Sequence, residues 1–270
     1  MPYTVNCSIL LTDLPLLQRP AAAKAAGFDA VEFWWPFATS VPAEVEVDSF
    51  EKAITEAGVQ LTGLNFHAGD MSAGDRGLVS WPARSGEFRD NLDVAAGIGG
   101  RLGCKAFNAL YGNRIAGVAP EEQDQLAIEN LSLAAKAVAP IGGTVLLEPV
   151  SGAPKYPLLT AEDALAVIEK VKSFGGDLNI KLLADFYHLF VNGDDVEAVI
   201  AKHTPEFGHI QIADAPGRGE PGTGTLPVAA WLKKSRELGY SGYVGLEYKS
   251  DAANPFAWLA SERLADELTR

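Results

Sequence analysis

The sequence is poor in cysteine and histidine and carries an excess of acidic residues. Only two cysteines, Cys7 and Cys104, occur among its 270 residues. Both lie inside apolar runs, so we expect buried, reduced thiols rather than a disulfide framework. The chain has 35 acidic residues against 22 basic ones, which gives a formal net charge of −13. This charge argues against nucleic acid and anionic membranes as partners.

The sequence also lacks long apolar runs and any change of composition along its length. No stretch of 18 or more apolar residues occurs, so we expect no membrane span. The first residues lack the basic segment and apolar core of a signal peptide. No Pro-rich or Ser-rich linker divides the chain. We therefore predict a cytoplasmic protein in which residues 1–270 form one domain.

A regular alternation of strand-like and helix-like segments is the main feature that the sequence does contain. Eight apolar, strand-like runs are followed in turn by eight helix-like segments, many of them closed by glycine. The strands are expected at 4–10, 30–34, 59–66, 104–111, 144–149, 180–185, 208–214 and 243–248. The helices are expected at 14–26, 45–57, 85–102, 120–139, 161–172, 195–203, 227–238 and 254–268. Strict alternation implies parallel strands and predicts an α/β fold, a single (β/α)8 TIM barrel. A doubly wound open sheet is the alternative.

Four polar residues each end one of the apolar runs: Glu148, Asp185, Gln211 and Glu247. Active sites of such barrels lie at the C-terminal ends of the strands. A carboxylate buried there costs free energy unless a partner pairs it, and one divalent cation could pair all four residues. Carboxylate and amide oxygens suit Mg²⁺ or Mn²⁺ better than Zn²⁺. For any one of these residues alone, hydrogen bonding to loop amides is the alternative.

Two further residues are candidates for contact with a substrate. His188 follows Asp185 by three residues and could lean over the same opening as the strand runs into its loop, to bond a substrate oxygen or assist proton movement. Arg218 lies in the glycine-rich segment 217–222 and could hold an anionic or hydroxylated substrate. That segment formally matches the dinucleotide pattern G-x-G-x-x-G, but Pro221 interrupts it and the strand–helix context is missing.

Other residues near the expected strand ends are weaker candidates. Glu32, His67 and Lys249 could also line the opening and contact substrate, although a loop hydrogen bond for His67 and a loop cation for Lys249 are the alternatives. The long segment 68–84 could act as a lid. Trp34 and Trp35 could wall a pocket or simply pack, and His203 and His209 are expected to be structural and away from the opening.

The order of these segments resembles that of the hydroxypyruvate isomerase family, within the wider group of xylose-isomerase-like barrels. The resemblance covers nearly the whole chain, at 68–70 through 75–77, 87–90, 147–149, 185–188, 208–214, 218–224 and 245–249. The segments GHIQIAD at 208–214 and RGEPGTG at 218–224 are the most specific.

The resemblance implies an activity and a set of roles. It implies a metal-dependent isomerase that interconverts hydroxypyruvate and tartronate semialdehyde, in the manner of an aldose–ketose isomerase. It implies that Glu148, Asp185, Gln211 and Glu247 bind the metal and that Glu148 and Glu247 are the acid/base pair. It also implies that His188 and Arg218 contact the substrate.

Departures from the family pattern leave the substrate open. They occur at His67, Phe190 and Thr225, so an isomerase or 3-epimerase of another small sugar or sugar acid, such as a 2-oxo-tetronate, is an alternative.

Metal-dependent DNA cleavage on the same barrel would need several histidine ligands and a basic surface, which four histidines and the net charge do not favour. A non-catalytic sugar-binding protein is a further alternative, and association into a homo-oligomer is possible.

Overall fold

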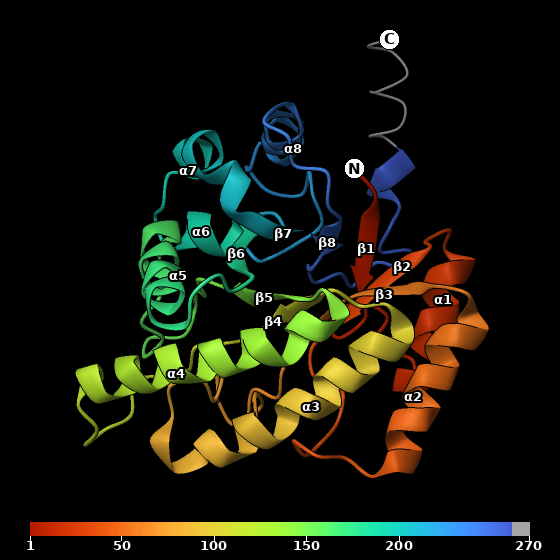
Figure 1. Ribbon diagram of the computed structural model, residues 1–270. Coiled ribbons are helices and arrows are strands. Elements are labelled where there is room, and N and C mark those ends of the chain that lie inside the picture. The colour runs from red at the N-terminus through yellow and green to blue at the C-terminus, as the bar shows by residue number, and fades with distance from the viewer. Residues whose placement is uncertain (261–270) are drawn as a thin grey trace.

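The computed structural model describes residues 1–260, which contain a closed barrel of eight parallel strands (Figure 1). Each strand pairs with its neighbours in the sequence, and β8 pairs with β1 to close the sheet. The strands are β1 (Tyr3–Asn6), β2 (Ala30–Phe33), β3 (Gln60–Asn65), β4 (Ala106–Asn108), β5 (Thr144–Leu147), β6 (Ile180–Asp185), β7 (Phe207–Ile212) and β8 (Val244–Leu246). The predicted barrel is confirmed and the open sheet is excluded.

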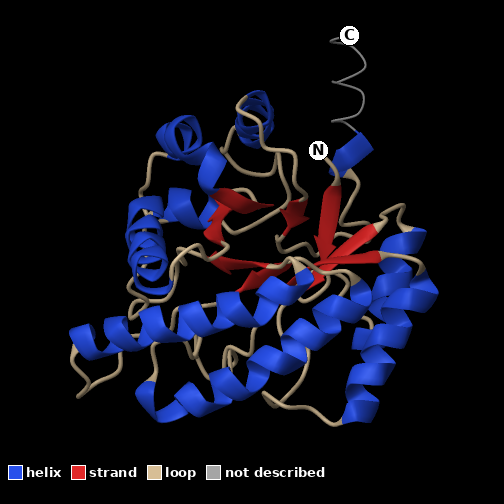
Figure 2. Ribbon diagram, viewed as in Figure 1, coloured by secondary structure: helices blue, strands red, loops and turns tan. Residues whose placement is uncertain are grey.

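Helices surround the strands on all sides, as Figure 2 shows in blue around red. They are α1 (Arg19–Ala25), α2 (Glu44–Ala57), α3 (Ser85–Leu102), α4 (Pro120–Val138), α5 (Ala161–Gly175), α6 (Phe186–Val191), α7 (Val196–His203) and α8 (Val228–Glu237). None of the helices in residues 1–260 is long and apolar enough to cross a bilayer.

Local sequence signals set many of the helix boundaries. Thr160 caps the start of α5 with its side-chain oxygen, and Asp163 bonds back to the Thr160 backbone, which is the reciprocal capping box. Gly58 and Gly103 end α2 and α3 with φ values of 65° and 73°. A residue with a β-carbon would be strained in that left-handed conformation.

The outer face of the sheet packs against the helices through apolar side chains. Phe66 lies between Phe88 and Phe107, with ring centroids 5.6 and 5.7 Å apart. Cys7 and Cys104 are buried free thiols, and burial raises the pKa of both to about 12. The expectation of buried, reduced cysteines agrees with this placement.

Several predicted elements differ in extent from the observed ones. The predicted helix 14–26 begins as a 3-10 turn, Leu16–Gln18, before α1, and the predicted strand 104–111 is reduced to β4. The short helix α6 begins directly after β6, where a loop was expected. The helix predicted at 254–268 lies partly outside the described residues.

Candidate active site

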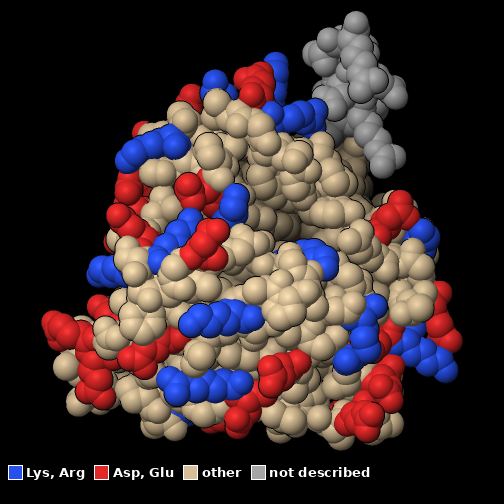
Figure 3. Space-filling view, in the orientation of Figure 1, with Lys and Arg blue, Asp and Glu red and all other residues tan. Residues whose placement is uncertain are grey.

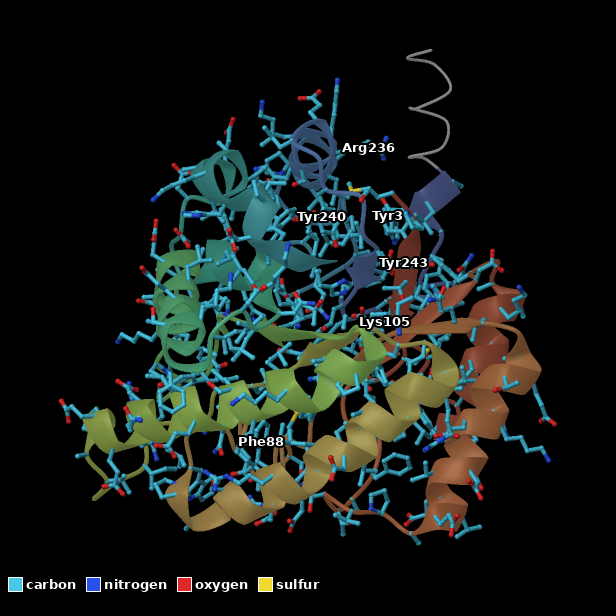
Figure 4. All side chains as sticks on the ribbon, viewed as in Figure 1. Tyr3, Phe88, Lys105, Arg236, Tyr240 and Tyr243 are labelled. Atoms are coloured by element: carbon cyan, nitrogen blue, oxygen red, sulfur yellow. The ribbon has the colours of Figure 1, made fainter. Side chains whose placement is uncertain are left out.

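The C-terminal ends of β5, β6, β7 and β8 carry the four residues that the sequence singles out. Asp185 and Gln211 are register partners on β6 and β7, whereas Glu148 and Glu247 directly follow β5 and β8. Each is at most 5% exposed. In Figure 4, Tyr3, Lys105 and Tyr243 lie around the middle of the view, at or just before the first residues of their strands. The four site residues lie at the other end of the barrel, because they stand at or directly after the last residues of their strands.

Asp185 caps the start of helix α6, where backbone N–H groups bind its carboxylate. Its Oδ1 accepts hydrogen bonds from the backbone N–H groups of Tyr187 and His188, at 2.8 and 3.1 Å. Backbone donors at a helix start stabilise a carboxylate there. This leaves Oδ2 for the centre of the site, 3.6 Å from Nε2 of His188.

His188 lies on α6, not on the loop that the sequence suggested, and its imidazole reaches the carboxylates. Its Nε2 is 3.8 Å from Glu148 Oε1, and oxygen or nitrogen atoms of Glu148, Asp185 and His188 all lie within 4.8 Å of one another. The Ser151 backbone N–H donates to Nδ1 at 3.1 Å. Burial lowers the pKa of His188 to about 4, so the ring is neutral at pH 7 and carries its proton on Nε2.

Arg218 joins two of the strand-end carboxylates. Its Nη2 donates to Glu247 Oε1 and lies 3.4 Å from Asp185 Oδ2. The guanidinium also stands over the Tyr187 ring, 5.6 Å from the centroid. Arg218 adopts φ 59°, and its carbonyl accepts the backbone N–H of Lys249 at 2.7 Å. The side chain predicted to contact substrate therefore reaches the same site.

The loop that presents Arg218 is built around one buried carboxylate. Asp214 Oδ1 accepts from the backbone N–H groups of Ala215 and Leu226, and Oδ2 accepts from those of Gly222 and Gly224, all at 2.8–2.9 Å. The sequence alone does not indicate this role for Asp214, because the four donors come together only once the loop has folded back on the end of β7.

The acid/base properties of the site follow from the burial of several carboxyl groups close to one another. Burial, with Glu247 and Asp185 nearby, raises the pKa of Glu148 well above its usual range, although Asn108 Nδ2 donates to its Oε2 at 2.7 Å. Burial raises the pKa of Glu247 to about 8, against the opposing charge of Arg218. Glu247 can therefore exchange a proton near neutral pH, and the pKa of Glu148 is shifted in the same direction.

The donor set fits a hard divalent cation. Gln211 Oε1 is a buried acceptor with no hydrogen-bond partner, while its Nε2 donates to Glu32 Oε1 at 2.7 Å. An orphaned buried amide oxygen costs free energy that a ligand can recover. Glu148, Asp185, Gln211 and Glu247 offer oxygen atoms, so these four residues could hold such an ion.

The structure corrects the expected placement of Glu32. Glu32 is 3% exposed and lies inside the barrel, where both its oxygens are bonded, rather than at the opening. One of its partners is His209, whose Nε2 is 2.7 Å from Glu32 Oε2. His209 is structural in the sense expected, but it lies within the barrel beside this acid. Single-sequence patterns could not find this pair, since the two residues are 177 positions apart.

A large cavity adjoins the loops after β2 and β3. Its volume is about 690 Å³. His67 lines this cavity together with Trp34, Trp35, Phe37, Arg84 and Glu87 among others. The side chain of Lys249 is exposed.

The long segment 68–84 is anchored at its base by ion pairs. Arg84 Nη1 donates to Asp75 Oδ2 at 2.7 Å, and its Nε and Nη2 donate to the two oxygens of Glu87. His67 is buried, which lowers its pKa, and its Nε2 is 3.8 Å from Glu87 Oε2. The role of this segment as a lid stays a prediction.

Comparison with known proteins assigns the chain to a family. The model of the "Xylose isomerase-like TIM barrel" family matches residues 20–268. A Streptomyces coelicolor protein provisionally named a hydroxypyruvate isomerase is 52% identical over 264 residues, which is 95% of each chain. The chain belongs to the xylose isomerase-like TIM barrel family. The hydroxypyruvate isomerase of Escherichia coli is 32% identical over 92% of this chain and 93% of its own length.

These relationships identify the family member as an isomerase of the aldose–ketose type. A 2-oxo-tetronate isomerase of Cupriavidus necator is 32% identical over 95% of this chain and 96% of its own length. The family resemblance stated from the sequence is thus confirmed.

One similar solved structure carries a different name. A crystal structure from Brucella melitensis, described as an AP endonuclease of family 2, superposes with a TM-score of 0.86 at 30% identity, over 97% of this chain and 99% of that one. In the present chain, acidic and basic side chains are interspersed on the face that Figure 3 displays, and the net charge is −13. An excess of negative charge over the whole chain does not favour a phosphate backbone as ligand.

Proposed function

We propose that this family member is a divalent-metal-dependent isomerase that interconverts hydroxypyruvate and tartronate semialdehyde. The observation that carries the proposal is the pair Glu148 and Glu247, two buried carboxyls with raised pKa that share one site with Asp185, His188 and Arg218. Hydroxypyruvate isomerases are among its relatives. We propose Glu148, Asp185, Gln211 and Glu247 as the metal ligands, with Mg²⁺ or Mn²⁺ as the ion.

The reaction moves one proton between adjacent carbons. One of Glu148 and Glu247, in its ionised form, removes a proton from C3 of hydroxypyruvate, which yields an enediolate. The same or the other glutamate returns a proton to C2, while the hydroxyl proton moves from O3 to O2. A divalent ion bound by these residues supplies positive charge that stabilises the developing oxyanions.

The remaining residues orient the substrate and exclude water. His188 presents its Nε2–H as a donor to a substrate oxygen, and its neutral state at pH 7 avoids a competing positive charge. Arg218 offers a planar fork suited to the substrate carboxylate. Burial of the site strengthens each of these interactions, because the effective dielectric constant is lower than in water.

The experiment that tests this proposal is proton NMR of hydroxypyruvate with the protein in D₂O, with Mg²⁺ and again with a chelator. We expect metal-dependent formation of tartronate semialdehyde, with deuterium at the carbon that receives the proton. Folded, Mg²⁺-loaded protein that leaves hydroxypyruvate unchanged would contradict the assignment.

The names of the relatives support a second candidate, the isomerisation of a 2-oxo-tetronate. The Cupriavidus necator relative, at 32% identity, is named a 2-oxo-tetronate isomerase. The same assay with a 2-oxo-tetronate separates the two candidates by their relative kcat/KM values.

A further inference from the structure

Glu32 is a buried acid that the proposed proton transfer does not use. It lies on β2 and is 3% exposed. Both its oxygens are occupied: Oε1 accepts from Gln211 Nε2 at 2.7 Å and from Asn6 Nδ2 at 3.1 Å, and Oε2 is 2.7 Å from His209 Nε2. Its partners thus include Gln211, one of the proposed metal ligands.

The bond to Gln211 has a fixed direction. An ionised carboxylate only accepts hydrogen bonds, whereas an amide has a donor end and an acceptor end. Because Gln211 turns its NH₂ toward Glu32, its Oε1 must point elsewhere. That oxygen is the buried acceptor without a partner, and it is the atom with which a glutamine can bind a cation.

A second branch from Glu32 reaches Glu247. Asn6 Nδ2 donates one hydrogen to Glu32 Oε1 and the other to Glu247 Oε2, at 3.1 and 2.9 Å. The Asn6 amide is itself oriented, because its Oδ1 accepts the Ser8 backbone N–H at 3.0 Å. Glu32 and Glu247 are therefore joined by one donor, which holds Oε2 of Glu247, while its Oε1 faces Arg218 Nη2 at the centre of the site.

The surroundings of Glu32 leave its carboxylate little freedom. His209 precedes Gln211 by two residues on β7, so both side chains point to the barrel interior. A β-carbon on Gly245 would stand 2.6 Å from Glu32 Oε1, and one on Gly63 would stand 3.2 Å from its Cβ. Glycines on β8 and β3 thus make the space that this carboxylate fills.

We propose that Glu32 is a positioning residue that sets the Gln211 amide oxygen and the Glu247 carboxylate for a divalent cation, with His209 and Asn6 as its partners. The inference rests on the proposed function, since it needs those two residues to be ligands. It concerns affinity for the ion, so it can be measured apart from turnover.

The test is the affinity of the purified full-length protein for Mn²⁺, measured by calorimetry, for the wild type and Glu32→Gln. A glutamine at 32 keeps the shape but can also donate, so the Gln211 amide is no longer forced to one orientation. We expect Kd to rise about 10- to 100-fold, as for other groups that orient metal ligands. Unchanged Mn²⁺ affinity in folded Glu32→Gln would overturn the proposal.

A matched control and a pair of His209 variants keep the test decisive. Thr62→Val removes a buried hydroxyl that bonds Thr4 at 2.7 Å elsewhere in the barrel interior, and it should leave the Mn²⁺ affinity unchanged. His209→Gln retains a donor toward Glu32 and should stay within about threefold of wild type, whereas His209→Leu should weaken Mn²⁺ binding about 10-fold or more. Equal affinities for the two His209 variants would overturn the proposal even if Glu32→Gln fails to fold.

Failure of the proposed function has a different signature. A wild type that binds Mn²⁺ but isomerises no candidate acid overturns the activity, while the fold-changes in Kd still decide the role of Glu32. A wild type that binds no divalent ion overturns both.

Discussion

At the scale of single residues, the main feature is that two glutamates share one buried site. Glu148 and Glu247 are both buried, and the pKa of each is raised. Their neighbours differ: Asn108 donates to Glu148, whereas Asn6 and Arg218 donate to Glu247. These different partners give the two carboxyls distinct environments, as a proton donor and a proton acceptor require.

Replacing Glu247 should separate chemistry from folding. We expect Glu247→Gln to lower kcat by at least about 10²-fold, because a glutamine cannot accept the carbon-bound proton, while the circular dichroism spectrum is unchanged. Glu51→Gln is the control, since Glu51 pairs with Arg101 away from the strand ends and its loss should not affect kcat. Turnover near the wild-type rate in Glu247→Gln would remove this residue from the mechanism.

The loop that presents Arg218 can be tested by replacing Asp214, the buried carboxylate that holds it. Asp214→Asn replaces one acceptor oxygen by an NH₂ group that would face two backbone N–H donors, which should cost about 1–3 kcal/mol of stability. We expect KM to rise because Arg218 is less well placed, with little change in Mn²⁺ affinity. Asp163→Asn, which alters a cap on α5, is the control and should leave KM as it is. A KM equal to that of wild type would show that Asp214 does not position Arg218.

Sequence patterns identified the residues that act at strand ends but not those that orient them. Glu148, Asp185, Gln211 and Glu247 could be found because each interrupts an apolar run at its end. Asn6, Asn108 and Ser151 could not, since their importance depends on which strand lies opposite after the barrel closes. Glu32 was found as a candidate but placed at the opening, because a strand pattern gives the direction of a side chain and not its depth.

At the scale of elements, the bounds of the long helices and strands were predicted well, whereas the short elements were predicted poorly. Strand β6 and helix α3 begin and end as expected, because strong apolar periodicity and clear terminating residues define them. Helix α6 was missed: six residues are too few for a periodic pattern, and its start depends on Asp185 serving as a cap as well as a site residue.

The loop between β3 and α3 offers a stability test with an internal control. Gly77 and Gly74 both have positive φ, 113° and 101°. A β-carbon on Gly77 would lie 1.9 Å from the Leu110 carbonyl oxygen, whereas one on Gly74 would meet nothing within 4 Å. We expect Gly77→Ala to cost about 3 kcal/mol or more of unfolding free energy, and Gly74→Ala only about 1 kcal/mol. Equal losses, measured by urea unfolding, would show that the loop can move away from Leu110.

At the scale of the whole molecule, the buried acids couple stability to pH. The pKa of Glu247 is near its usual 4.5 in the unfolded chain and about 8 in the fold. Its contribution to stability is therefore complete below about pH 4.5 and is lost as the pH rises through 8. The raised pKa of Glu148 acts in the same direction.

Thermal melts in chelator should reveal this coupling. Between about pH 5 and pH 8 we expect the Tm of the wild type to fall relative to that of Glu247→Gln, which has no charge to gain at this position. Added Mn²⁺ should raise the wild-type Tm more at pH 8 than at pH 5, because the ion binds ionised carboxylates. Parallel Tm curves for the two proteins would contradict the assigned shift.

The pairing of β8 with β1 has a consequence for aggregation during folding. The two strands pair through Tyr3–Val244, Thr4–Gly245 and Val5–Leu246. In the closed sheet of the described residues, every strand has a neighbour on both sides. No row of unpaired backbone groups is then offered to another molecule, and such a row is where aggregation by strand addition begins. Until β8 docks, β1 and β7 each present such a row. The docking of β8, the last of these eight strands along the chain, removes both exposed edges in a single step.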